Sequence, residues 1–132
     1  MPIKAAFDMV KEATAEIETV SPADAMARMN DDDFLLVDIR DPRELEREGR
    51  IPGAFHAPRG MLEFWVDPAS PYYKEVFGEG KKYVFFCAAA GRSAISVQTL
   101  QNMGMVNIAQ LGGGFGGWVK EGGPVEGGKA RE

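Results

Sequence analysis

Residues 83–94, YVFFCAAAGRSA, carry most of the information on the fold of this 132-residue chain. Four apolar residues that favour strands precede Cys87, the single cysteine, and three alanines, a glycine and Arg92 follow it. An uninterrupted apolar run is typical of a strand buried on both faces of a parallel sheet. We expect a tight loop and then a helix after it. Open α/β sheets bind ligands at the carboxyl ends of their strands, so this stretch predicts both a fold and a site.

The rest of the chain alternates between strand patterns and helix patterns. Strand patterns fall at 34–39, 83–86 and 106–111, with a very short one within 51–58, and helical patterns at 5–17, 21–30, 41–49 and 93–103. Ser21 and Asp41 precede prolines as helix N-caps, and Gly104 ends a helix. The alternation predicts a single α/β domain with a largely parallel sheet.

Composition limits the classes of function. Hydrophobic residues make up 45% and charged residues 27%, as in globular domains. The net charge of −5 argues against a nucleic-acid partner. No apolar stretch approaches the roughly 18 residues of a membrane span, and the N-terminus lacks the apolar core of a signal peptide. We therefore expect a cytoplasmic protein without membrane contact, in which a free thiol stays reduced.

The chain offers too few ligands for a common metal site. Cys87 is the lone cysteine and His56 the lone histidine, so the usual zinc sites of several cysteines and histidines are excluded. We expect neither a metal nor a cofactor.

Cys87 has two interpretations. Free cysteine is among the most buried residue types, so one at the end of a strand can be a small core residue. The residues after it favour a nucleophile instead. Small side chains let the backbone wrap closely, Gly91 can adopt a positive φ angle, and successive N–H groups can form an anion-binding nest beside the helix that Ser93 opens. Together with Arg92, these groups would stabilise a thiolate, which is the nucleophilic form.

Three motifs in the chain resemble those of a known family. They are LLVDIRDPRELEREGRIPGAFHAP at 35–58, CAAAGRS at 87–93 and LGGGFGGWVKEGGPV at 111–125. In this order they resemble a single-domain rhodanese, of the rhodanese-like sulfurtransferase family, over roughly residues 17–125. The resemblance implies a rhodanese-like α/β sandwich: a central, mostly parallel five-stranded sheet flanked by helices on both faces. We divide the chain into an N-terminal helical extension (1–16), a rhodanese-like domain (17–125) and a flexible C-terminal tail (126–132).

The resemblance also implies an enzyme of sulfur metabolism. Cys87 would take a sulfane sulfur from a donor such as thiosulfate or a persulfide, become a persulfide itself, and pass the sulfur to a thiophilic acceptor. The acceptor would be cyanide, a thiol or a cysteine of a partner protein. The loop that binds the transferred sulfur through its amides would consist of Ala88, Ala89, Ala90, Gly91 and Arg92.

Further residues are expected around this loop. Asp38 and Arg40 end a buried strand, and we expect a structural role for them because buried charges are normally paired. Ser93 would support the loop. Arg59 is a candidate second cation for an anionic donor, and its alternative is a solvated surface arginine.

Other functions stay open from the sequence. Phosphatases and arsenate reductases of related fold use a C-x5-R loop, whereas Cys87 and Arg92 form the shorter C-x4-R, which suits a terminal sulfur better. A persulfide relay or binding module for a partner protein is a second alternative, since the uncharged AAA segment leaves the donor open. Gly112, Gly114 and Gly117 form a G-x-G-x-x-G pattern, but only fifteen residues follow, too few for a dinucleotide-binding unit.

Overall fold

The protein is described here by a computed structural model that covers residues 2–129. Its elements, in chain order, are α1 (Ala6–Glu16), β1 (Thr19–Val20), α2 (Pro22–Arg28), β2 (Phe34–Asp38), α3 (Pro42–Glu48), β3 (Phe55–His56), η1 (Arg59–Met61), α4 (Leu62–Val66), η2 (Glu75–Gly78), β4 (Lys82–Phe86), α5 (Gly91–Met103), β5 (Ile108–Leu111) and α6 (Gly114–Lys120).

The five strands form one sheet in the order β1-β5-β4-β2-β3, and every pairing is parallel. This confirms the predicted α/β fold with a five-stranded parallel sheet. β4 is the central strand, between β2 and β5. β2 and β3 lie on one side of β4, and the connection that follows β4 leads to β5 on its other side. The carboxyl end of β4 is therefore the topological switch point, where such sheets bind ligands.

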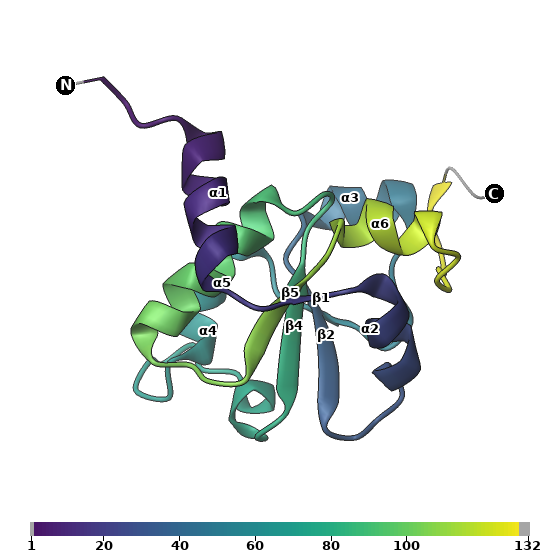
Figure 1. Cartoon of the computed structure of the whole chain (residues 1–132). Coiled ribbons are helices and arrows are strands. Elements are labelled where there is room, and N and C mark those ends of the chain that lie inside the picture. The colour runs from purple at the N-terminus through teal and green to yellow at the C-terminus, as the bar shows by residue number, and fades with distance from the viewer. Residues whose placement is uncertain (1, 130–132) are drawn as a thin grey trace.

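Helices cover both faces of the sheet (Figure 1). α4 and α5 pack on one face, and α2 and α6 on the other. Side chains of β4 alternate between the two cores, because successive residues of a strand point to opposite faces. Val84 and Phe86 join the core under α2 and α6, whereas Tyr83, Phe85 and Cys87 join the core under α4 and α5. The alternation thus places the Cys87 side chain on the α5 side.

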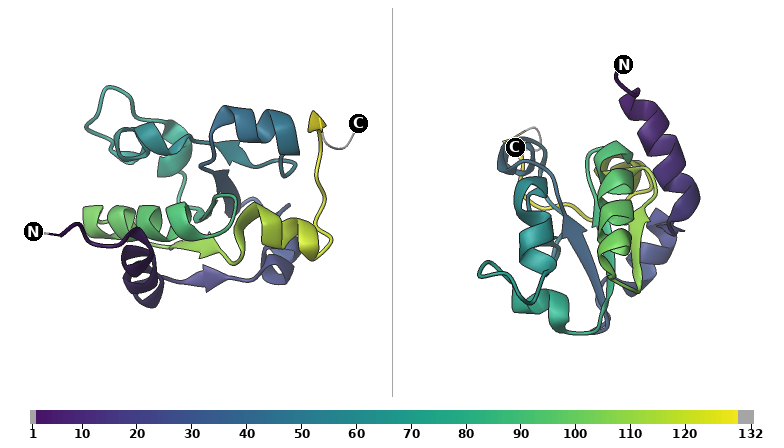
Figure 2. Two further views of the ribbon diagram at one scale, coloured as in Figure 1. Left: turned by 90° about the horizontal axis from the view of Figure 1, so that it is seen from above. Right: turned by 90° about the vertical axis from the view of Figure 1, so that its left-hand side faces the viewer.

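Both ends of the chain add to this unit. α1 packs against the outside of α5, and its N-terminal end projects beyond the carboxyl edge of the sheet (Figures 1 and 2). Near the other end, Arg50 and Glu126 exchange backbone hydrogen bonds of 2.9 Å, and Lys129 pairs with Glu46. The part of the predicted tail at 126–129 therefore lies against α3, and residues 130–132 lie outside the described residues.

The structure differs from the sequence-based assignment at several elements, among them β1, α5 and β5, which begins at Ile108 and not at residue 106. β1, only two residues long, follows no periodic pattern, and its pairing with β5 alone defines it. α5 begins at Gly91, two residues before Ser93. Within residues 2–129, no helix combines the length and the apolar character that a membrane crossing needs.

Candidate active site

Cys87 lies at the carboxyl end of β4 and is 1% exposed. Residues 88–90 connect it to α5, whose N-cap residue, Ala90, provides no side-chain hydrogen bond. Gly91 does not adopt the positive φ angle that we expected, because it is already the first helical residue. A Cβ atom on Gly91 would lie 3.7 Å from a methyl carbon of Val10, so this glycine lies beside α1. A positive φ angle, which glycine adopts readily, is found instead in the segment that packs on the loop.

That segment is the start of α6. The backbone N–H of Phe115 donates to the Cys87 carbonyl at 2.8 Å, and that of Gly116 donates to the Ala88 carbonyl at 3.0 Å. Gly114 has φ +61°, and a Cβ atom there would lie 2.6 Å from the Cys87 carbonyl oxygen. Only glycine therefore fits, and the close approach holds the loop carbonyls toward α6.

The loop amides are left without backbone acceptors. Within residues 2–129, the N–H groups of residues 88–93 donate to no backbone carbonyl. Three of them belong to the first turn of α5, where N–H groups have no partner within the helix and carry a partial positive charge. A short loop of unpaired amides next to a cysteine can bind an anion or a polarised sulfur.

A chain of polar side chains runs from Cys87 into the sheet. The thiol of Cys87 donates to Ser93 Oγ, with sulfur and oxygen 3.7 Å apart. Ser93 Oγ in turn donates to Gln110 Oε1 at 2.8 Å. Gln110 Nε2 donates to Thr19 Oγ1 at 3.2 Å, so β5 and β1 both support the serine. Ser93 and Gln110 are buried, which keeps this chain in a fixed geometry.

Arg92 does not stand free beside the thiol. Its two terminal nitrogens donate to the two carboxylate oxygens of Glu44, each at 3.0 Å. Glu44 also accepts the backbone N–H of Asp41 at 2.9 Å and thereby completes the capping box of α3. Hydrogen bonding to Glu44 raises the pKa of Arg92, with smaller contributions from Cys87, and the same bond lowers the pKa of Glu44. The charge of Arg92 is thus compensated by α3.

Asp38 and Arg40 form a buried pair beneath the loop. Arg40 Nε donates to Asp38 Oδ1 at 3.0 Å, and Arg40 Nη2 donates to Asp38 Oδ2 at 2.8 Å. Arg40 Nη2 also donates to the Gly49 carbonyl at 2.9 Å. The guanidinium carbon lies 4.0 Å from the centre of the Phe115 ring. Arg40 Nη1 is buried and has no hydrogen-bond partner among the described residues. The pair therefore supports Phe115, the residue whose N–H binds the Cys87 carbonyl.

The side chains of Arg59 and His56 both have hydrogen-bond partners within the domain. Arg59 donates to both oxygens of Glu63, at 2.6 and 3.2 Å, and this bond lowers the pKa of Glu63. His56 Nε2 donates to the Arg40 carbonyl at 2.8 Å. Within residues 2–129, no group of three histidine, cysteine, aspartate or glutamate side chains is arranged to hold a metal.

Gln110 and Glu44 are among the residues of the site that were not anticipated from the sequence. Gln110 had a visible signal, because it is a polar residue in a buried strand of the sequence IAQL. Glu44 showed only its local role, at the third position after the N-cap Asp41. Its bond to Arg92 spans 48 positions, and no local pattern predicts it.

Residues 21–121 match the model of the rhodanese-like domain family, and the chain belongs to this family. Relatives include a sulfurtransferase from Allochromatium vinosum, 28% identical over 110 residues, which cover 83% of this chain and 92% of the relative. The chain spans 55% and 61% of the length of two other curated relatives that it matches. The first two motifs and most of the third lie within the matched residues, and the relatives of this family include a named sulfurtransferase.

Solved structures agree with the fold. A protein of unknown function from Rhodopseudomonas palustris, named as a possible tyrosine phosphatase, is 50% identical, with a TM-score of 0.89 over 96% of this chain and 99% of that one. The polysulfide-sulfur transferase homodimer from Wolinella succinogenes is 32% identical, with a TM-score of 0.69 over 92% of this chain and 87% of that one.

Proposed function

We propose that this protein is a sulfurtransferase that carries a sulfane sulfur as a persulfide on Cys87. The observation that carries the proposal is the position of this single cysteine at the switch point of the sheet, followed by a short loop whose amides have no backbone acceptor among the described residues. Membership of a family with sulfurtransferases supports it. The substrate and the steps below are part of the proposal.

The first half-reaction loads the cysteine. The Cys87 thiolate attacks the outer sulfur of the donor, a new S–S bond forms, and the donor's own S–S bond breaks. With thiosulfate the leaving group is sulfite, which departs with the bonding electron pair. The loop amides of residues 88–93 would stabilise the negative charge on the transferred sulfur, because fixed N–H donors in a site without water interact strongly with developing charge.

The second half-reaction transfers the sulfur from Cys87 to the acceptor. A thiolate or cyanide attacks the outer sulfur of the persulfide, forms a bond to it, and releases the Cys87 thiolate. The result is covalent catalysis in two steps, in which the enzyme alternates between a thiol and a persulfide. Ser93 would help to orient the sulfur of Cys87, since it is within hydrogen-bonding range of it and is itself fixed by Gln110.

A phosphatase is the second candidate, because the similar R. palustris protein is named as a possible tyrosine phosphatase. Two features of this chain favour sulfur over a phosphoryl group. The loop from Cys87 to Arg92 is one residue shorter than the C-x5-R loop. In addition, Glu44 already binds both terminal nitrogens of Arg92. The guanidinium therefore has no free pair of terminal N–H donors with which to bind a phosphate dianion.

Intact mass spectrometry tests the proposal directly. Incubation with a sulfane-sulfur donor should add about 32 Da, one sulfur atom, and a thiol acceptor should remove it. Cys87→Ser should show no added mass and no turnover. Hydrolysis of an aryl phosphate that disappears in Cys87→Ser, without sulfur loading of the native protein, would instead establish the phosphatase. A thiol that reacts with no donor would leave a binding module for a partner protein.

A further inference from the structure

The arginines around the Cys87 loop are all paired with carboxylates. Five such pairs have nitrogen–oxygen contacts of 3.1 Å or less: Arg40 with Asp38, Arg43 with Asp41, Arg47 with Glu48, Arg59 with Glu63, and Arg92 with Glu44. The loop itself contributes only alanines and a glycine before Arg92. The positive potential at the sulfur therefore comes from the loop amides and the N-terminus of α5, with little from free side-chain charge.

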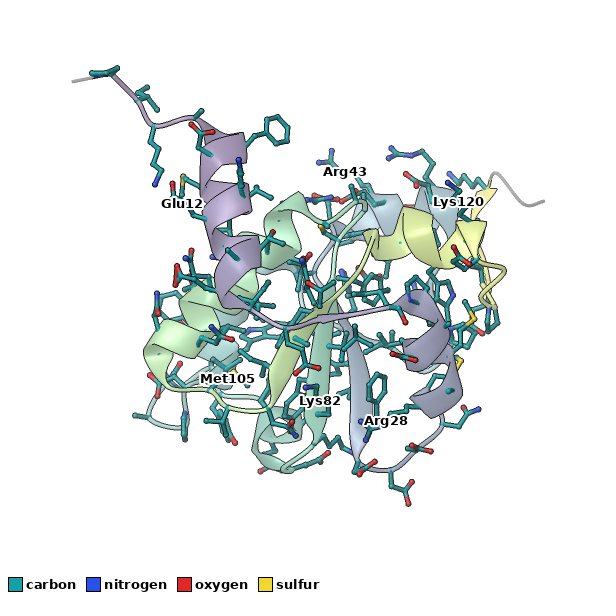
Figure 3. The ribbon with its side chains drawn as sticks, viewed as in Figure 1. Glu12, Arg28, Arg43, Lys82, Met105 and Lys120 are labelled. Atoms are coloured by element: carbon teal, nitrogen blue, oxygen red, sulfur yellow. The ribbon has the colours of Figure 1, made fainter. Side chains whose placement is uncertain are left out.

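Arg92 is the cation that matters most for a donor. It belongs to the loop, and its neighbour across the rim is Glu44 on α3. The two line a shallow surface hollow of about 360 Å³, together with Asp41, Arg47 and Arg43, which Figure 3 shows on α3 at the carboxyl edge of the sheet. The side chain of Arg92 is 45% exposed, whereas that of Glu44 is only 17% exposed. The carboxylate is thus the fixed member of the pair, held also by the Asp41 N–H, and Arg92 is drawn toward it.

We propose that Glu44 is a specificity-determining residue of this site: by binding Arg92 at both nitrogens, it selects sulfane-sulfur donors of low charge over dianions such as thiosulfate. This inference rests on the proposed sulfur transfer. A dianion that enters the site meets an arginine whose charge is already cancelled and a carboxylate beside it. A donor with a single charge, or with an uncharged body, loses less from that arrangement, because Coulomb energies scale with the product of the charges.

Glu44→Gln is a clean perturbation of this pair. The glutamine side chain has the same shape, and both glutamate and glutamine serve at the third position of a capping box, so α3 keeps its N-terminal hydrogen bond to Asp41. The substitution removes one negative charge and frees Arg92. The matched control is Glu46→Gln, which removes the same charge from the same helix but affects only the exposed contact to Lys129.

Two donors that differ by one charge provide the test. Thiosulfate carries two negative charges and releases sulfite, whereas methanethiosulfonate carries one and releases methanesulfinate. In both reactions the Cys87 thiolate forms a bond to the terminal sulfur and breaks its S–S bond. Freeing Arg92 should raise kcat/KM for thiosulfate about tenfold and that for methanethiosulfonate about threefold, because a given potential acts twice on the dianion.

The ratio of the two donors decides the inference. Glu44→Gln should raise the preference for thiosulfate about threefold, the quotient of the two effects, and Glu46→Gln should leave it unchanged. An unchanged ratio in Glu44→Gln, or an equal rise in Glu46→Gln, overturns the role of Glu44. A native protein that takes sulfur from neither of these donors nor from a persulfide refutes the proposed function, and the inference with it, so the two failures are distinguishable.

A second readout needs only the thiol. Iodoacetate and iodoacetamide alkylate cysteine at the same atom, and only iodoacetate is charged. Because Cys87 is the single cysteine, intact mass follows both reactions without ambiguity. The rate ratio of iodoacetate to iodoacetamide should rise about threefold in Glu44→Gln. A constant ratio would show that Glu44 does not set the potential at Cys87, which also overturns the inference.

Discussion

Replacement of Gly114 by alanine should displace the Cys87 loop. At φ +61° an added Cβ atom would lie 2.6 Å from the Cys87 carbonyl oxygen, about 0.8 Å inside an ordinary contact of 3.4 Å, and closer still to the Ala89 carbonyl. Neither partner is a flexible side chain, so the loop backbone must move. The left-handed conformation alone costs about 1–2 kcal/mol for an L-residue, and the overlap adds to it.

The effect on function should exceed the effect on stability. A displacement of about 1 Å at a reacting group can lower a rate about 100-fold. We therefore expect Gly114→Ala to remain folded but to load sulfur on Cys87 about 100-fold more slowly. Urea unfolding measures the stability, and intact mass against time measures the loading. The Phe115 and Gly116 amides would no longer reach the loop carbonyls at 2.8 and 3.0 Å.

Gly104→Ala separates backbone strain from loop displacement. Gly104 also has a positive φ angle, +109°, but a Cβ atom there would meet nothing within 4 Å. It ends α5 at the opposite end from the Cys87 loop. This variant should lose stability and keep its loading rate. Loading by Gly114→Ala at the native rate, or an equal loss in Gly104→Ala, would contradict the argument.

Three further predictions concern the surroundings of the loop. Asp38→Asn leaves the charge of buried Arg40 uncompensated and should reduce the free energy of unfolding by about 3–5 kcal/mol in urea titrations. Because Arg92 lowers the pKa of Glu44, the pair stabilises the folded state above the ordinary carboxyl pKa of 4.5 and loses its effect as the pH falls through the lowered value. The stability difference between the native protein and Glu44→Gln should thus be largest at neutral pH and close in acid, as pH-dependent unfolding would show. Trp118→Phe removes the hydrogen bond from Trp118 Nε1 to the Pro124 carbonyl, 2.8 Å long, and should cost about 1–3 kcal/mol. Hydrogen exchange should report opening of residues 124–129 in the same variant, and unchanged exchange there would contradict this anchor.

Local signals in the sequence predicted most of the elements. The apolar runs gave β2, β4 and β5, and the N-caps Ser21 and Asp41 and the C-cap Gly104 marked helix ends where the structure has them. Each of these signals lies within a few residues of the element that it defines. β1 was missed because two residues carry no periodicity, and only the pairing with β5 makes them a strand.

The residues of the candidate site also fall into those that a local sequence signal predicted and those that only contacts between distant segments define. The position of Cys87 after a buried strand was predictable, because strand, loop and helix are consecutive in the chain. The partners of the loop were not, since they come from distant segments: Glu44 binds Arg92 across 48 positions, and Gln110 binds Ser93 across 17. Arg92 was expected to help the loop amides to stabilise a thiolate, and the sequence did not indicate that Glu44 on α3 binds its guanidinium.

The three motifs that carry the family resemblance contact one another around the Cys87 loop. These contacts hold the loop backbone in place. Arg40 of the first motif lies against the ring of Phe115 of the third. Phe115 binds the carbonyl of Cys87 in the second. The motifs thus build a common support that fixes the backbone of the loop after Cys87. In the proposed function, the charge presented to the donor depends instead on side chains at the rim, such as Glu44, which contacts Arg92 and is not part of this support. The proposal thus assigns the position of the reactive sulfur to the fold and the choice of donor to the side chains at the rim.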